Sequence, residues 1–209
     1  MIFQLDERLV FPNRELAEPD GLLAVGGDLS ADRLLLAYSH GIFPWYSDET
    51  PILWYSPHER FVLPPAELRI SKSMRQVLRS GKFTVTVNQQ FESVIDACSA
   101  VPREGQDGTW ITDDMKQAYV NLHRLGHAHS YEVWQGKELV GGLYGVQTGR
   151  VFCGESMFSR ASNASKIALI ALCQSVLYNL IDCQVHTEHL ESMGARFISR
   201  KDYLHILQG

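Results

Sequence analysis

The stretch SYEVWQGKELVGGLYGVQTGRVFCGE, residues 130–155, determines how this chain is expected to fold. Strand-forming residues fill 130–135, 138–146 and 150–155, and a short connection that contains a glycine separates each run from the next. Such connections between strand-forming runs are typical of hairpins. The stretch therefore predicts three successive antiparallel strands.

Further regular elements are expected on both sides of these strands. Periodicity and capping residues predict a helix near 71–80, a strand at 83–87, a helix capped by Asn88, a helix capped by Thr112, a helix at 164–178, a strand at 180–185, a short helix closed by Gly194, and a last helix with Ser199 and Asp202 as a capping box. This mixture predicts the α+β class, with a mostly antiparallel central sheet flanked by helices.

Residues 1–63 have a different character, because they are rich in Pro, Gly and Trp and poor in long periodic segments. One helix is predicted there, between an N-cap at Ser30 and a stop at Gly41. Pro64 and Pro65 mark a boundary, since proline neither continues a helix nor donates to a sheet. We therefore expect a small N-terminal domain over 1–63 and a second domain over 64–209.

Composition limits where a nucleic acid could bind. The chain has 209 residues and a formal net charge of −5, so any such site must be a local basic patch. Three basic residues near 71–80 recur at i, i+3 and i+7 and share one helix face: Lys72, Arg75 and Arg79. Lys82 lies just beyond them, and the patch suits a phosphate backbone. The next candidates for an RNA contact are Arg60, Arg69 and Arg103.

Several features predict a cytoplasmic protein without membrane association. The chain has four cysteines, none in a CxxC pair and all among apolar neighbours, which is typical of reduced, buried thiols: Cys98, Cys153, Cys173 and Cys183. The N-terminus carries Asp6 and Arg8 where a signal peptide needs an apolar stretch. The longest uncharged apolar run, 167–173, is too short to span a bilayer.

Five stretches, taken together, carry a resemblance to one enzyme family. They are GLLAVGGDLS at 21–30, GIFPW at 41–45, GTWIT at 108–112, LGHAHSYEVW at 125–134 with LVGGLYGV at 139–146, and FCGESMFSR at 152–160, followed by NASK and IDCQV. In this order and spacing they resemble the bacterial leucyl/phenylalanyl-tRNA–protein transferases. The β-β-β-α-β order of the second half resembles the GNAT type of acyltransferase fold.

The resemblance implies a specific reaction. The enzyme would transfer Leu, Phe or, less readily, Met from aminoacyl-tRNA to the α-amino group of proteins that begin with Arg or Lys. It would form a peptide bond and mark the acceptor for N-end-rule degradation. We expect aminoacyl-tRNA and acceptor proteins as partners, a monomeric chain, and neither a metal nor a cofactor.

The resemblance also places the reacting centre at Asp182, Gln184 and Glu155. Asp182 and Gln184 are two residues apart on the expected strand, so both side chains should point to one face. Gln184 would orient the amine, and Asp182 would polarise Gln184 or help remove the proton. Glu155 would hold an ammonium or a ribose hydroxyl. Apolar residues match the family's pocket for the aminoacyl side chain: Trp45, Trp110, Leu143, Met157, Leu172 and Val176.

Three other functions fit the sequence less well. An acyl-CoA enzyme would carry a glycine-rich pyrophosphate loop, whereas 160–165 contains no glycine. A non-catalytic RNA-binding module would not need an acid and an amide together on one strand. A metal hydrolase could use His127 with His129 or His186 with His189, but neither pair has a third ligand at a familiar spacing.

Overall fold

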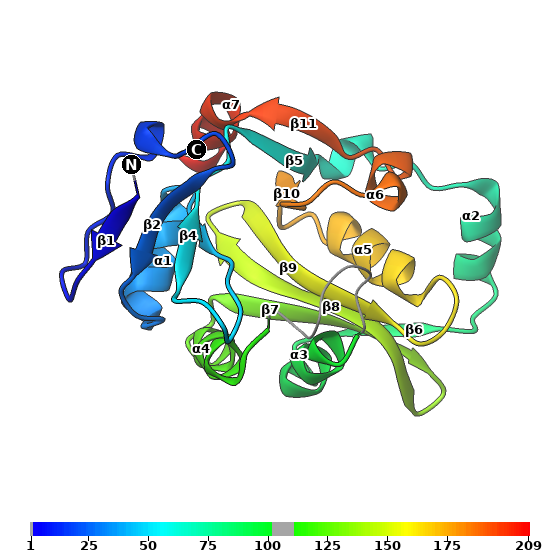
Figure 1. The fold of residues 1–209 in the computed structure, drawn as a ribbon. Coiled ribbons are helices and arrows are strands. Elements are labelled where there is room, and N and C mark those ends of the chain that lie inside the picture. The colour runs from blue at the N-terminus through cyan, green and yellow to red at the C-terminus, as the bar shows by residue number, and fades with distance from the viewer. Residues whose placement is uncertain (1, 102–110) are drawn as a thin grey trace.

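The computed structural model describes residues 2–101 and 111–209, and Figure 1 shows a small sheet beside a larger one. The small sheet has four strands in the order β1-β2-β4-β3: Phe3–Leu5, Leu22–Gly26, Leu53–Tyr55 and Phe43–Pro44. The large sheet has seven strands in the order β11-β5-β10-β9-β8-β7-β6: Arg196–Ser199, Glu59–Leu63, Leu180–Asp182, Val151–Ser159, Glu138–Thr148, Ala128–Gln135 and Thr84–Val87.

The α+β class is confirmed. β9 and β10 pair in parallel, and every other pair of neighbours in the large sheet is antiparallel. The helices are α1 Ala31–Ser39, α2 Lys72–Arg79, α3 Phe91–Ser99, α4 Asp113–Arg124, α5 Ala164–Gln174, α6 Glu188–Ser192 and α7 Arg200–Leu207, with 3-10 turns at Arg14–Leu16 and Pro65–Glu67. A small N-terminal domain thus precedes a mostly antiparallel sheet flanked by helices.

Two apolar cores lie on the two faces of the large sheet, because successive strand residues point to opposite sides. On β5, Phe61 and Leu63 join the core under α5, whereas Val62 joins the core under α1, α3, α4 and α7. On β10, Ile181 joins the core under α5, and Leu180 joins the core on the other face. Figure 1 shows α5 separated from α3 and α4 by the sheet.

Three predicted helix starts are confirmed by the cap contacts: the side chains of Ser30, Thr112 and Ser199 accept a backbone N–H of the first turn. The helix predicted near 71–80 has a cap of the same kind at Ser71. Asn88 is not a cap. It adopts a left-handed backbone with a φ of 58° and accepts from the Ser130 N–H of β7 at 2.9 Å, so α3 begins later, after Gln90.

The chain passes from the small sheet to the large one earlier than the proline pair indicates. β5 lies between β10 and β11, so a boundary at 63/64 would separate this strand from the sheet to which it is hydrogen-bonded. Pro65 merely begins a 3-10 turn after the strand. Strand pairing therefore puts the crossing at 56–58, between β4 and β5.

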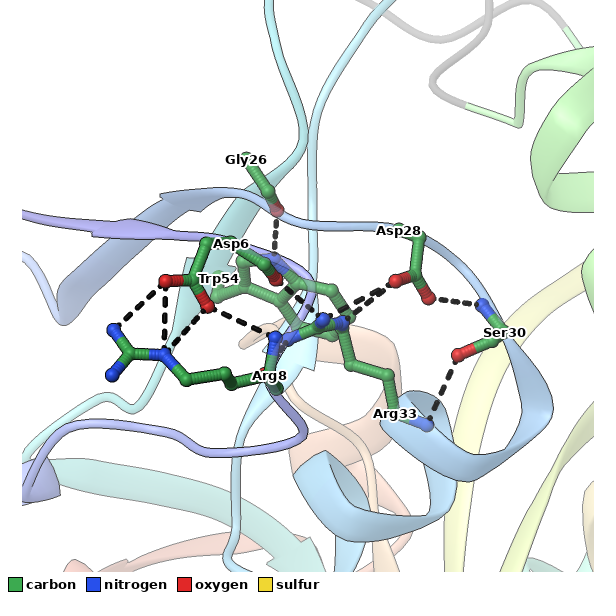
Figure 2. A network of polar contacts seen from close by, with 7 residues as sticks. All are labelled: Asp6, Arg8, Gly26, Asp28, Ser30, Arg33 and Trp54. Carbon is green, nitrogen blue, oxygen red and sulfur yellow. Dashed lines mark hydrogen bonds and ion pairs between the residues drawn. The ribbon is translucent and has the colours of Figure 1, made fainter.

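Arg33 of α1 is fully buried and anchors the N-terminal segment, as Figure 2 shows. Its guanidinium donates to the backbone oxygens of Asp6 at 2.7 Å and of Arg8 at 3.2 Å, and to the Asp28 carboxylate at 3.2 Å. A buried guanidinium needs partners for its N–H groups. These contacts therefore fix the residues around β1 against the start of α1.

β8 and β9 contain a bulge that reorients one acidic side chain. Gly145 pairs with Gly154 and Tyr144 pairs with Ser156, so Glu155 is an extra residue in β9. Bulges kink a strand and redirect a side chain. A Cβ at Gly145 would lie 2.2 Å from the backbone oxygen of Cys153, so glycine is required for this close approach.

We predict that Gly145→Ala lowers the free energy of unfolding by about 3 kcal/mol or more, because the atom in conflict belongs to the backbone of the neighbouring strand. Gly149→Ala is the matched control: Gly149 has a φ of 56° but no atom within 4 Å of an added Cβ, so its cost should be about 1–2 kcal/mol. Urea unfolding of both variants measures the difference. Equal losses would contradict the role given to Gly145.

Candidate active site

The candidate site lies where β9 and β10 stop pairing. The parallel register runs from Leu180 with Val151 to Asp182 with Cys153, and β10 ends there. β9 continues to Ser159 through the bulge at Glu155. The sheet therefore opens beyond Cys153, and the side chains that follow on both strands face a shared space.

A cavity of about 490 Å³ occupies this space. Apolar side chains from β8, β9, β10, α5 and α6 form much of its wall: Leu143, Phe152, Met157, Leu169, Leu172, Ile181 and Leu190. The N-terminal domain contributes aromatic residues, namely Phe43, Trp45 and Tyr55. Polar residues from the open strand ends complete it: Glu155, Ser156, Asp182 and Gln184. The cavity therefore joins an apolar wall to a polar one.

Glu155 is 7 % exposed and receives hydrogen bonds from three side chains. Tyr38 of α1 donates to Oε1 at 2.7 Å, Tyr119 of α4 donates to Oε2 at 3.1 Å, and Gln184 donates through Nε2 to Oε1 at 2.9 Å. The two tyrosine oxygens are 2.6 Å apart. One carboxylate thus connects α1, α4 and the segment after β10.

Burial raises the pKa of the Glu155 carboxyl to about 7, although the hydrogen bonds from Tyr38, Tyr119 and Gln184 act in the opposite direction. The nearby Asp182 charge adds to the increase. A carboxyl with this pKa is close to half ionised at neutral pH. It can therefore take up or release a proton in the range where enzymes operate.

Asp182 and Gln184 do lie close together, but not as two residues on one face of a strand. Gln184 has a φ of 59°, and its backbone N–H donates to Asp182 Oδ1 at 3.1 Å. This turn, in which an aspartate accepts the N–H two residues later, ends the strand three residues before the predicted limit of 185. The two side chains are therefore close, as expected, but the cause is this turn and not the alternation of residues along a strand.

Arg60 of β5 forms a buried ion pair with Asp182. Arg60 is 2 % exposed and Asp182 is 0 % exposed. Arg60 Nη2 contacts Asp182 Oδ2, and Nη1 donates to the Gly41 backbone oxygen at 3.0 Å. Arg60 is thus excluded as a contact for RNA, for which it was a secondary candidate. Arg69 is exposed, and Arg103 lies outside the described residues.

The six predicted pocket residues do not all line the cavity in the part of the chain that the structure describes. Trp45, Leu143, Met157 and Leu172 line the cavity. Val176 does not: it lies beyond the end of α5, has a φ of 56°, and is 81 % exposed. The predicted helix to 178 placed Val176 on the same face as Leu172, whereas the real helix ends at Gln174. Trp110 lies outside the described residues.

The predicted basic face of α2 is present. Met74 and Val77 pack against the core, whereas Lys72, Arg75 and Arg79 are exposed on the other side of the helix. Lys82 is exposed after the helix end. In Figure 1, α2 lies at the end of the molecule opposite the small sheet.

Sequence reasoning missed Arg60, Tyr38 and Tyr119 as members of the site. One signal was available for Tyr38, which lies on the apolar face of α1 with Leu34 and Ala37. A buried tyrosine hydroxyl needs a hydrogen-bond partner, so a tyrosine on an apolar face indicates a polar group inside the protein. The identity of that group depends on strands distant in sequence.

We predict that Glu155→Gln makes stability less dependent on pH. The folded-state pKa of about 7 exceeds the ordinary value of 4.5, so the protonated carboxyl contributes stability below about pH 4.5 that is lost as pH rises through about 7. The loss is on the order of 3 kcal/mol. Urea unfolding at several pH values measures it, and the difference between the two proteins isolates this carboxyl. Parallel pH profiles would refute the assignment.

Within 2–101 and 111–209, no helix is long and apolar enough to cross a membrane. In the same part of the chain, no three residues among His, Cys, Asp and Glu are grouped so that they could hold a metal ion.

Comparison with known proteins places the chain in a family. Residues 62–208 match leucyl/phenylalanyl-tRNA protein transferase, and residues 27–58 match the N-terminal domain of the same family. Relatives named leucyl/phenylalanyl-tRNA–protein transferase include that of Syntrophobacter fumaroxidans, 59 % identical over 99 % of this chain and 89 % of the relative, and that of Xanthomonas oryzae pv. oryzae, 57 % identical over 95 % and 81 %.

Solved structures with a similar arrangement are distant in sequence. FemX is 10 % identical with a TM-score of 0.48, covering 81 % of this chain and 66 % of FemX. A GCN5-related N-acetyltransferase from Kribbella flavida is 11 % identical with a TM-score of 0.38, covering 77 % and 58 %. The sequence matches are the decisive ones: the chain belongs to the leucyl/phenylalanyl-tRNA protein transferases, a family of aminoacyltransferases.

Proposed function

We propose that this chain transfers Leu, Phe or, less readily, Met from aminoacyl-tRNA to the α-amino group of proteins that begin with Arg or Lys, and so marks them for N-end-rule degradation. The observation that carries the proposal is the cavity at the open end of β9 and β10, with an apolar wall beside the Glu155–Gln184 pair. Aminoacyl-tRNA as donor implies that the reaction takes place in the cytoplasm.

The apolar wall is suited to the donor side chain. Leu143, Met157 and Leu172 offer aliphatic surface with no charge to desolvate. Leu, Phe and Met are unbranched at Cβ, so a cavity that is narrow near the ester would disfavour Ile and Val. One misplaced methyl group costs only about 1–3 kcal/mol, so selectivity should be partial. Trp45, which is 41 % exposed and lines the same cavity, adds an aromatic face.

The polar wall is suited to the acceptor amine. Because Gln184 Nε2 donates to Glu155, the amide oxygen of Gln184 remains to accept a hydrogen bond from the incoming amine. The neutral amine attacks the ester carbonyl, a peptide bond forms as the ester C–O bond breaks, and the tRNA 3′ oxygen leaves with a proton from the attacking nitrogen. Glu155, with its pKa of about 7, can hold the ammonium or accept its proton.

The reaction does not require a strong base. The ester is already activated, and an α-amine with a pKa of about 7.7–8.0 is roughly one-tenth neutral at pH 7. Positioning the two reactants therefore supplies much of the acceleration. We propose that Asp182, which is buried and paired with Arg60, orients Gln184 and does not remove the proton.

We predict transfer of labelled Phe from Phe-tRNA to peptides that begin with Arg or Lys, at least about tenfold faster than to matched peptides that begin with Asp or Ser. The physical reason is the acidic and amide character of the polar wall, which favours a cationic acceptor. Radiolabel incorporation measures the rates. Transfer that ignores the first residue, or that occurs only with acyl-CoA, would rule out the proposal.

The basic face of α2 is proposed as the contact for the tRNA backbone. Lys72, Arg75 and Arg79 are exposed together on a chain whose net charge is −5. Neutralised phosphates release counterions, and the affinity then depends on salt. Lys82 extends the same positive region beyond the helix.

We predict that the triple change Lys72→Gln, Arg75→Gln and Arg79→Gln weakens tRNA binding at low salt and flattens the plot of log affinity against log salt by about two to three units. The matched control removes three other exposed cations and so the same charge: Arg124→Gln, Lys137→Gln and Lys201→Gln. Filter binding over a range of salt concentrations distinguishes them. The same slope in both triple variants would place the tRNA contact elsewhere.

A further inference from the structure

We propose that Arg60 is a positioning residue for the transfer reaction: it holds the buried Asp182 carboxylate that fixes Gln184 in the cavity. The inference rests on the proposed role of Gln184. Arg60 is not among the residues that line the cavity, and it acts through Asp182.

The two oxygens of Asp182 have different partners. Oδ2 contacts Arg60, whereas Oδ1 accepts the backbone N–H of Gln184 at 3.1 Å. A guanidinium on one oxygen sets the rotation of the carboxylate plane, and this rotation determines where the other oxygen lies. Arg60 therefore controls the contact that keeps Gln184 in its left-handed conformation, with a φ of 59°.

Arg60 is itself held in a fixed orientation. Its guanidinium lies between two rings, 4.8 Å from the centre of Phe43 and 4.5 Å from the centre of Tyr203. Nη1 donates to the backbone oxygen of Gly41. Gly41 has a φ of 70°, and an added Cβ would lie 3.0 Å from Leu204, so the chain turns closely against α7 at this point.

These contacts connect both sides of the cavity. Gly41 and Phe43 belong to the segment after α1, and Phe43 lines the cavity. α1 also carries Tyr38, which donates to Glu155. A path of contacts thus leads from α1 through Arg60 and Asp182 to Gln184, and through Glu155 back to α1. Arg60 is the cation in this path, and it balances a carboxylate that has no exposed surface.

Loss of the cation should loosen the contact between Asp182 and Gln184. Arg60 contacts Oδ2, so without Arg60 the Asp182 carboxylate plane loses the contact that sets its rotation. Oδ1 would then hold the Gln184 N–H less well, and fewer molecules would keep Gln184 in its turn beside Glu155. A smaller fraction of molecules with Gln184 in place would give a lower kcat.

The experiment compares Arg60→Met with the wild-type protein in transfer of Phe from Phe-tRNA to an Arg-initiated peptide, with rates normalised to the folded protein measured by circular dichroism. We expect kcat to fall by about 100-fold while KM for Phe-tRNA changes less than about threefold. A merely structural role would leave the kcat of the folded protein unchanged, or would change kcat and KM alike.

Two further variants keep the test decisive. Arg60→Lys retains the charge without the planar pair of donors, so we expect kcat about tenfold below wild type with KM nearly unchanged, a partial rescue of Arg60→Met that can be measured even if Arg60→Met fails to fold. Arg200→Met is the matched control, because Arg200 is also buried and bonds the Ser56 oxygen and Glu15 but not Asp182. It should lower Tm and leave the kcat of the folded protein near the wild-type value.

The outcomes separate this inference from the proposed function. Wild-type protein that transfers nothing would refute the function and the inference together. A fully active Gln184→Ala would refute the proposed site. With wild-type protein active and Gln184→Ala at least about tenfold slower, the inference is overturned if Arg60→Met or Arg60→Lys keeps wild-type kcat, or if Arg200→Met shows the same loss of kcat at unchanged KM.

Discussion

The end of pairing between β9 and β10, at Cys153 and Asp182, is the constraint on which the rest of this structure depends. Parallel strands that remained paired would bring their backbones together and leave no room for a ligand between them. Two local features keep them apart: the turn that Asp182 forms with the Gln184 N–H, and the bulge that inserts Glu155 into β9. The cavity is the space between these two features.

Buried charge is concentrated at this opening, and its arrangement explains why the N-terminal domain is needed there. Asp182 is paired with Arg60 of β5, whose other contacts are to Gly41, Phe43 and Tyr203. Glu155 is held by Tyr38 of α1. Burying a carboxylate is costly unless it is paired and hydrogen-bonded. The N-terminal domain thus bonds Glu155 directly and supports Asp182 through Arg60, so it completes the site as well as covering it.

The two carboxylates have different environments and therefore suit different tasks. Asp182 has an adjacent guanidinium and no exposed surface, which suits a fixed negative charge. Glu155 receives only neutral donors from the side chains that bond it, and burial raises its pKa to about 7. Neighbouring acids with different environments commonly divide their roles in this way. Family resemblance places both residues at the reacting centre, and the surroundings of each indicate which one is suited to exchange a proton.

The sequence alone determined the family, the α+β class, the three central strands and the caps at Ser30, Thr112 and Ser199, because motifs, short hairpins and caps are local patterns. It also brought Asp182, Gln184 and Glu155 to one site, but through motif resemblance. Only the tertiary structure decided that β5 belongs to the large sheet, that Val176 points to solvent, and that Arg60 pairs with Asp182. Arg60 and Asp182 are 122 residues apart in the chain. Contacts at such a separation depend on strand order and register, which no periodicity within a single segment encodes.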